Sequence, residues 1–254
     1  MPIGWQLILR RVDDAVLVPG VAQARRFSSL VCRLGVGLPL LAFQAAGGHA
    51  HVVVLSDRPT AGELARRLNL GLGQSLGHRG ALEAVRLRPV HDQAHARNLV
   101  RYVLDQRRHH DLTPDPFHEA SALPDLLGLR LAGAWMRDQH AQRMPELPRR
   151  ALIELLSQDP WTVERFDPAC LAQAAAAALP VEALVGRPPL VVAARAAAVQ
   201  VARGRLRSAE VAAALSCPLR TVQRLAGVPV VPELLRAVEG QWRLRSAVAA
   251  AGEG

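Results

Sequence analysis

Four side chains in this sequence have types and spacing suited to chemistry on a phosphodiester. His49 and His51 flank Ala50 at the start of an apolar segment, and alternate residues of a strand point to the same face. Tyr102 is the sole tyrosine, and Gln106 follows it at the spacing of one helical turn. Two imidazoles, an amide oxygen and a phenol can therefore converge on one metal-bound phosphate.

Cleavage of a phosphodiester by tyrosine needs a phenol in line with phosphorus, a Lewis acid on a non-bridging oxygen, and rigid positioning. Tyr102 is the candidate nucleophile, and His49, His51 and Gln106 are the candidate metal ligands. These ligands are neutral, so Mg²⁺ or Mn²⁺ would present its full charge to the phosphate. The expected product is a 5′-phosphotyrosine link, which keeps the bond energy and permits rejoining. A zinc site would need a further soft ligand, which the sequence does not place.

The hydrophobic pattern predicts the elements that must position these residues. We expect strands at Trp5 to Val12, Leu38 to Gln44, His49 to Leu55 and Leu82 to Leu87, and helices at Val21 to Leu34 and after a capping box at Thr60 to Glu63. Gly47-Gly48 makes the turn before His49. The order β-α-β-β-α-β predicts an α+β fold with the ferredoxin-like split motif, followed by a helix from about His95 to Arg108 that contains Tyr102 and Gln106.

The chain divides into three predicted parts. Residues 1–118 form the ferredoxin-like catalytic domain. Prolines interrupt residues 119–150, which we interpret as a connector with a short helix near Leu126 to Gln139. Residues 151–254 are rich in alanine and leucine at helical spacing, which predicts a small all-helical domain.

A helix-turn-helix is expected within the helical part. Ser208 to Leu215 and Leu219 to Ala226 form two short helical patterns, separated by a turn at Ser216-Cys217-Pro218. The pattern buries Val211, Leu215, Val222 and Leu225, and it presents Arg220, Thr221, Gln223 and Arg224 outward for contact with DNA. An ordinary helical hairpin is the alternative.

The charge balance favours a polyanionic partner. The net charge is +9, the isoelectric point is about 11.2, and all 31 basic residues are arginine. A GC-rich genome explains the absence of lysine, but it does not explain the excess of basic over acidic residues. The arginines expected to contact DNA phosphates in the first part are Arg66, Arg67, Arg97, Arg101, Arg107 and Arg108.

The cysteines and the apolar segments bear on the compartment. Cys32, Cys170 and Cys217 are widely spaced and follow no ligand pattern, which favours a reducing cytoplasm over a disulfide framework. Charged residues follow soon after Met1, unlike a signal peptide, and arginine or glycine interrupts every apolar run. A soluble cytoplasmic protein without a membrane segment is expected.

The motif around His49, Ala50, His51, Tyr102 and Gln106 resembles that of the HUH single-tyrosine transposases, in particular the bacterial REP-associated tyrosine transposases. In that family a histidine, hydrophobic residue, histidine motif is followed by a helix with Tyr-x-x-x-Asn or Tyr-x-x-x-Gln. The resemblance spans about residues 5–118. It implies a transposase-type DNA nickase that acts on single-stranded, hairpin-associated DNA, as a monomer or a homodimer.

The C-terminal part resembles the helical DNA-binding domain of the replication initiator DnaA, notably at Ala194-Arg195 and at Ser208 to Ala226. Two other functions stay open. A domesticated relative that no longer cuts would be a DNA-binding regulator. A metal-dependent phosphohydrolase with a water nucleophile would need His49 but not the phenol of Tyr102.

Overall fold

The computed structural model covers residues 1–254 and describes all of them except 76, 78–79, 114, 157–165, 182 and 253–254. The backbone divides into two compact units, each with its own hydrophobic core. The first unit comprises Met1–Leu127 and Ala132–Leu155, and the second comprises Gly128–Leu131 and Leu156–Gly254. We describe each unit by itself.

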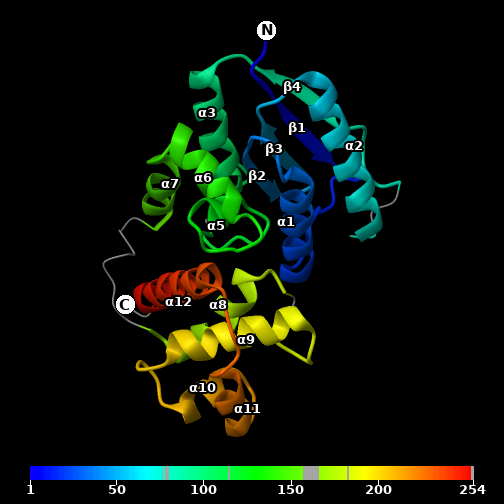
Figure 1. Ribbon diagram of the computed structural model, residues 1–254. Coiled ribbons are helices and arrows are strands. Elements are labelled where there is room, and N and C mark those ends of the chain that lie inside the picture. The colour runs from blue at the N-terminus through cyan, green and yellow to red at the C-terminus, as the bar shows by residue number, and fades with distance from the viewer. Residues whose placement is uncertain (76, 78–79, 114, 157–165, 182, 253–254) are drawn as a thin grey trace. The chain divides into compact units, whose positions relative to one another are not determined.

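The first unit is built on a four-stranded antiparallel sheet of order β2-β3-β1-β4, which confirms a mixed α+β class (Figure 1). The elements follow one another in the expected order, β1-α1-β2-β3-α2-β4. Their bounds are β1 Gly4–Arg10, α1 Val21–Gly35, β2 Leu40–Ala46, β3 His49–Val54, α2 Arg58–Ser75 and β4 Arg86–Val90. Since β1 and β2 each run antiparallel to β3, they are parallel to one another with β3 between them.

The two faces of the sheet differ in polarity. On one face Leu7, Leu9 and Val52 are almost fully buried, and helices α1 and α2 cover them (Figure 1). Their immediate neighbours along each strand point to the other face, where Gln6 meets His51. This second face lies against α3, which spans Gln93–Leu104.

Three element boundaries differ from those expected. Helix α2 begins at Arg58, before the predicted capping box, because Asp57 Oδ1 accepts a hydrogen bond from the Thr60 amide at 2.8 Å and caps the helix start. Strand β4 begins at Arg86, opposite Ile8 of β1, and Leu82 makes only an isolated bridge. The helix expected at 95–108 is divided into α3 and α4, the latter spanning Gln106–His109.

Apart from Gly128–Leu131, the segment expected to be a connector belongs to the first unit. It forms α5 (Leu123–Leu126), α6 (Ala134–Arg143) and the start of α7 (Leu147–Leu156). Near its start, the Ala45 amide donates to the Ala120 carbonyl at 3.0 Å, and the Ala122 amide donates to the Phe43 carbonyl at 2.8 Å. These bonds satisfy the free edge of β2, which explains why the segment folds onto the sheet rather than extending as a connector.

The described part of the second unit contains helices and no strand. These are α8 (Leu171–Ala178), α9 (Pro189–Ala202), α10 (Ser208–Ala214), α11 (Leu219–Leu225) and α12 (Pro232–Gly252), after a short 3-10 helix at Pro168–Cys170. Small alanine side chains of α8 and α9 pack around the buried indole of Trp242. None of the described helices has the length and apolarity needed to cross a bilayer.

Candidate active site

The histidine pair lies at the start of β3, on the face of the sheet that meets α3. The imidazole centroids of His49 and His51 are 4.9 Å apart, with the rings nearly perpendicular. In the strand register, His49 is opposite Arg10 of β1, and His51 is opposite Ile8 of β1 and Gln44 of β2. A turn at Gly47-Gly48, in which Gly47 has a φ of +57°, directly precedes β3, and β3 begins at His49. Local strand geometry thus places both imidazoles together, as the sequence predicts.

Gln6 holds the ring of His51. Nε2 of Gln6 lies 2.9 Å from Nδ1 of His51, and both side chains are buried. The opposite ring nitrogen, Nε2 of His51, is buried without a hydrogen-bond partner among the described residues. The ring is therefore oriented from one side and presents an unsatisfied nitrogen on the other.

Tyr102 lies on α3 beside this pair. Its ring centroid is 5.9 Å from that of His51, and 42% of the residue is exposed. The helix is anchored by the buried side chains of Val100, Val103 and Leu104, while Asp92 caps its start by accepting from the His95 amide. The nucleophile candidate thus has a rigid backbone, one side near the histidines and another side open to solvent.

Gln106 reaches the histidines by a different route from the one predicted. Helix α3 ends at Leu104, and Asp105 (φ −100°, ψ 12°) turns the chain before Gln106 begins α4. Gln106 is fully buried, and neither amide atom has a hydrogen-bond partner among the described residues. Its amide nevertheless lies close enough to His49 and His51 to favour their protonated forms.

Burial keeps both imidazoles neutral at neutral pH. It lowers the pKa of His51 to about 3, with further lowering from His49, His110 and Arg88. Burial also lowers the pKa of His49, and the neighbouring His110 adds to this effect. A neutral imidazole has a free lone pair on one nitrogen, which is the form that binds a metal ion.

His49 and His51 can hold a divalent cation in this site only if the amide oxygen of Gln106 is a third ligand. No group of three His, Cys, Asp or Glu side chains among the described residues is arranged to hold a metal. The unsatisfied buried atoms of His51 and Gln106, together with the neutral His49, form a set of two nitrogens and one oxygen. Buried polar atoms without partners are costly, so a ligand that satisfies them fits this site; for His51 a metal ion does so in the tautomer that carries its proton on Nδ1.

The site contains two further histidines, which the sequence analysis did not assign to it. The ring centroid of His110 is 4.7 Å from that of His49, and the ring centroid of His109 is 4.9 Å from that of Tyr102. Both follow directly after the tyrosine helix, and this adjacency is the signal that could have identified them. Their approach to the site depends on the turn at Asp105, which the sequence pattern does not show.

The predicted DNA-contacting arginines of the first unit fall into two groups. Arg97, Arg101 and Arg108 line the same pocket as Tyr102, and Arg107 is half-buried with its Nε 2.8 Å from the Thr113 carbonyl. The other two, Arg66 and Arg67, lie on α2 and form ion pairs with Glu63 at 2.8 and 2.7 Å. Since α2 covers the opposite face of the sheet, the structure does not bring this second group to the site.

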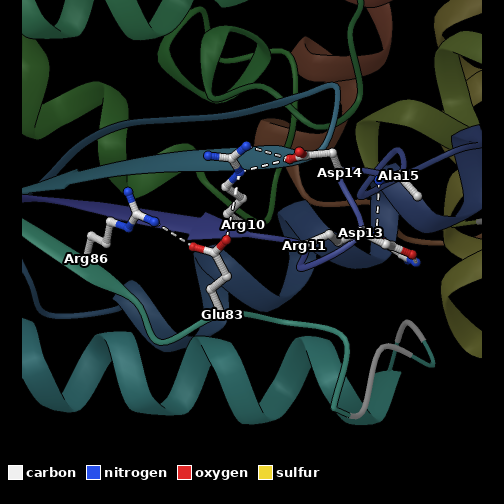
Figure 2. Close-up of polar contacts among 7 residues, drawn as sticks. All are labelled: Arg10, Arg11, Asp13, Asp14, Ala15, Glu83 and Arg86. Carbon is white, nitrogen blue, oxygen red and sulfur yellow. Dashed lines mark hydrogen bonds and ion pairs between the residues drawn. The ribbon is translucent and has the colours of Figure 1, made fainter.

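A charged network lies at the end of β1 (Figure 2), where Arg10 is opposite His49 in the strand register. Arg10 forms an ion pair with Asp14 at 2.7 Å and lies 4.0 Å from Glu83. Glu83 also pairs with Arg86 of β4 at 2.9 Å. The network therefore presents cations whose charge is largely balanced, and Arg10 contributes to the lowered pKa of His49.

The helix-turn-helix residues lie in the second unit, on α10 and α11. Val211, Leu215, Val222 and Leu225 are buried as expected. Ser216 adopts a φ of +48° in the turn between the two helices. The structure places the predicted DNA-contacting residues on the surface of α11, with Arg220, Gln223 and Arg224 exposed and Thr221 half-buried.

Comparisons with known proteins give a low-scoring structural similarity. No protein-family model and no curated protein matches the sequence. Among solved structures, the chain is similar to one described as "Structure of the REP associates tyrosine transposase bound to a REP hairpin". The TM-score is 0.36, the sequence identity is 11%, and the match covers 43% of this chain and 70% of the other. This similarity concerns the fold alone.

Proposed function

We propose that the first unit is a ferredoxin-like catalytic domain of a transposase-type DNA nickase, in which Tyr102 attacks a phosphodiester of single-stranded, hairpin-associated DNA. The observation that supports this most directly is the position of the Tyr102 ring, 5.9 Å from His51. At this position an exposed phenol lies beside two neutral imidazoles and near a buried amide that has no hydrogen-bond partner among the described residues.

In the proposed reaction the phenol oxygen of Tyr102 gives up its proton and forms a bond to phosphorus. The bond from phosphorus to the 3′ oxygen of the preceding nucleotide breaks, and that oxygen leaves as a 3′-hydroxyl after it takes up a proton. The 5′-phosphate remains linked to Tyr102. Attack by a 3′-hydroxyl reverses these changes and rejoins the strand, so no external energy source is needed.

The cofactor of this proposal is Mg²⁺ or Mn²⁺, held by His49, His51 and Gln106. Such an ion would supply Lewis-acid polarisation of a non-bridging phosphate oxygen. The chain's own contribution is to orient His51 through Gln6, to keep the imidazoles neutral by burial, and to hold the phenol on a rigid helix.

The test is formation of a covalent adduct. Purified protein is mixed with labelled hairpin-bearing single-stranded DNA and Mn²⁺, and the products are separated on a denaturing gel. An adduct in the wild type that is absent from Tyr102→Phe supports the tyrosine mechanism. Cleavage that survives in Tyr102→Phe but is lost in His49→Ala would show a water nucleophile, and it would exclude the proposal.

A second candidate function is DNA-binding regulation without cleavage. It is favoured by helix α11, which exposes Arg220, Gln223 and Arg224 on the surface of the second unit. Duplex binding that weakens in Arg224→Ala, with no adduct formed under Mg²⁺ or Mn²⁺, would support the regulator. Binding that is unaffected by substitutions on α11 would exclude this role for the helix-turn-helix.

A further inference from the structure

A pocket of about 600 Å³ opens beside Tyr102 within the first unit. One wall is formed by α3 and α4, and the other by Met144 and the residues that lead into and form α7. Tyr102 contributes to the lining, and its ring centroid lies 5.9 Å from that of His51. A group bound in this pocket would therefore lie next to whatever phosphate the phenol reaches.

The pocket combines an apolar floor with a basic rim. Leu104, Met144 and Leu147 are buried and supply apolar surface. The rim holds four exposed arginines, Arg97, Arg101, Arg108 and Arg150, which outnumber the three carboxylates of the lining, those of Asp105, Glu146 and Glu154. A flat, weakly polar ring system joined to a phosphate matches this division of surface, because the ring can be buried against the apolar floor while the phosphate meets the guanidinium groups.

The rim arginines are only partly neutralised. Arg150 and Arg101 share one carboxylate, that of Glu154, at 2.8 and 3.9 Å. Arg108 lies 3.6 Å from Asp105, and Arg97 makes no ion pair with any described residue. An incoming phosphate therefore meets cations that retain capacity for charge-assisted hydrogen bonds.

We propose that this pocket binds one nucleotide of single-stranded DNA adjacent to the phosphate that Tyr102 attacks, with the base against the apolar floor and the backbone at the arginine rim. The inference rests on the proposed function for the position of that phosphate. It adds a recognition site formed by the 144–154 segment, which lies outside the histidine and tyrosine motif. A base in a duplex is stacked and paired, so only an unpaired nucleotide can enter.

The experiment compares DNA with and without bases in a protein that does not cleave. Tyr102→Phe is titrated with fluorescent oligothymidylate, oligoadenylate and an abasic oligomer of the same length, and binding is followed by anisotropy. The three DNAs have the same backbone charge. Burial of one base against the apolar floor predicts roughly tenfold tighter binding of at least one base-bearing oligomer than of the abasic oligomer.

Two further substitutions test whether the tighter binding of base-bearing DNA arises in the pocket. Ala151→Trp fills the pocket, and the preference for bases should disappear. Ala94→Trp adds the same bulk at an exposed position of α3 outside the pocket, and the preference should remain. A preference that persists in a folded Ala151→Trp protein, or equal binding of all three DNAs by Tyr102→Phe, overturns the inference.

A surface variant covers the case in which Ala151→Trp does not fold. Arg150→Gln should weaken binding of all three DNAs severalfold, whereas Arg149→Gln, on the same helix but outside the pocket, should not. Equal effects of the two variants count against a phosphate at the rim. Binding here is measured without cleavage, so a base preference lost in Ala151→Trp, combined with no adduct in the wild type, would reject the proposed function and retain the pocket.

Discussion

Nδ1 of His51 and Nε2 of Gln6 lie 2.9 Å apart across neighbouring strands, in the buried layer between the sheet and α3. In this orientation the Gln6 amide donates to Nδ1, which places the proton of the neutral ring on Nε2. A half-turn of the amide presents Oε1 instead, which moves the proton to Nδ1 and frees the Nε2 lone pair. The orientation of the Gln6 amide therefore decides which nitrogen of the neutral His51 ring has a free lone pair.

Replacement of Gln6 should change the affinity of the site for a metal ion. Gln6→Leu removes the acceptor, and we expect roughly 10- to 100-fold weaker Mn²⁺ binding, measured by electron paramagnetic resonance on the Tyr102→Phe protein. Gln6→Glu provides an oxygen acceptor in every rotamer, and affinity should be at least that of the parent. Equal losses in the two variants would show that Gln6 only fills space.

The turn before the histidine pair should not accept a side chain. A Cβ on Gly48 would lie 2.8 Å from the Asp14 carbonyl oxygen, and this backbone is held by the bond from the Arg11 amide to the Gly48 carbonyl. We expect Gly48→Ala to lower the free energy of unfolding by about 1–3 kcal/mol, measured by urea denaturation.

The matched control for that substitution is Gly62→Ala on α2. A Cβ on Gly62 meets no atom within 4 Å. Alanine is favoured over glycine inside a helix by about 1 kcal/mol, so this variant should be unchanged or more stable. If both variants lose the same stability, the close approach of the Asp14 backbone does not explain the effect at Gly48.

Stability of the first unit should fall as the pH drops below about 6.5, the ordinary pKa of histidine. Burial lowers the pKa of His140 and of His118, against the opposing effect of their hydrogen bonds to the Leu41 and Ala45 carbonyls. The unfolded chain then binds more protons than the folded chain in this range, so the unfolding free energy decreases with falling pH. His140→Gln should give a shallower decline in urea titrations at successive pH values, and identical slopes would contradict this.

The buried ion pair between Arg25 and Glu119 should show that the segment directly after residue 118 contributes to the stability of the first unit. Its atoms are 2.9 Å apart, with the two side chains 6% and 9% exposed. Glu119→Gln leaves Arg25 with a buried charge that has lost its anionic partner, and we expect about 3–5 kcal/mol of destabilisation by urea denaturation. The exposed carboxylate of Glu63, which also pairs with arginine, is the control, and Glu63→Gln should change stability little. A small effect at Glu119 would show that the segment contributes little to this core.

Much of the local structure could be predicted because it depends on neighbours in the sequence. The alternation at His49, Ala50 and His51 puts both imidazoles on one face of β3, whatever packs against that strand. The helical spacing of Val211, Leu215, Val222 and Leu225 likewise places them in the core of the second unit. These periodicities are properties of a strand or helix alone, so the sequence contains them.

Tertiary packing decided the rest of the candidate site. The break at Asp105 buries Gln106 and brings His110 to His49, although the pattern through residue 108 suits one continuous helix. The pairing of Gln6 with His51, and the wall that residues 144–154 build beside Tyr102, join segments far apart in the chain. Periodicity shows which face of an element is buried, but not which distant side chain meets it. The motif residues were therefore evident from the sequence by itself, whereas their supporting residues and the adjacent pocket became evident only from the fold.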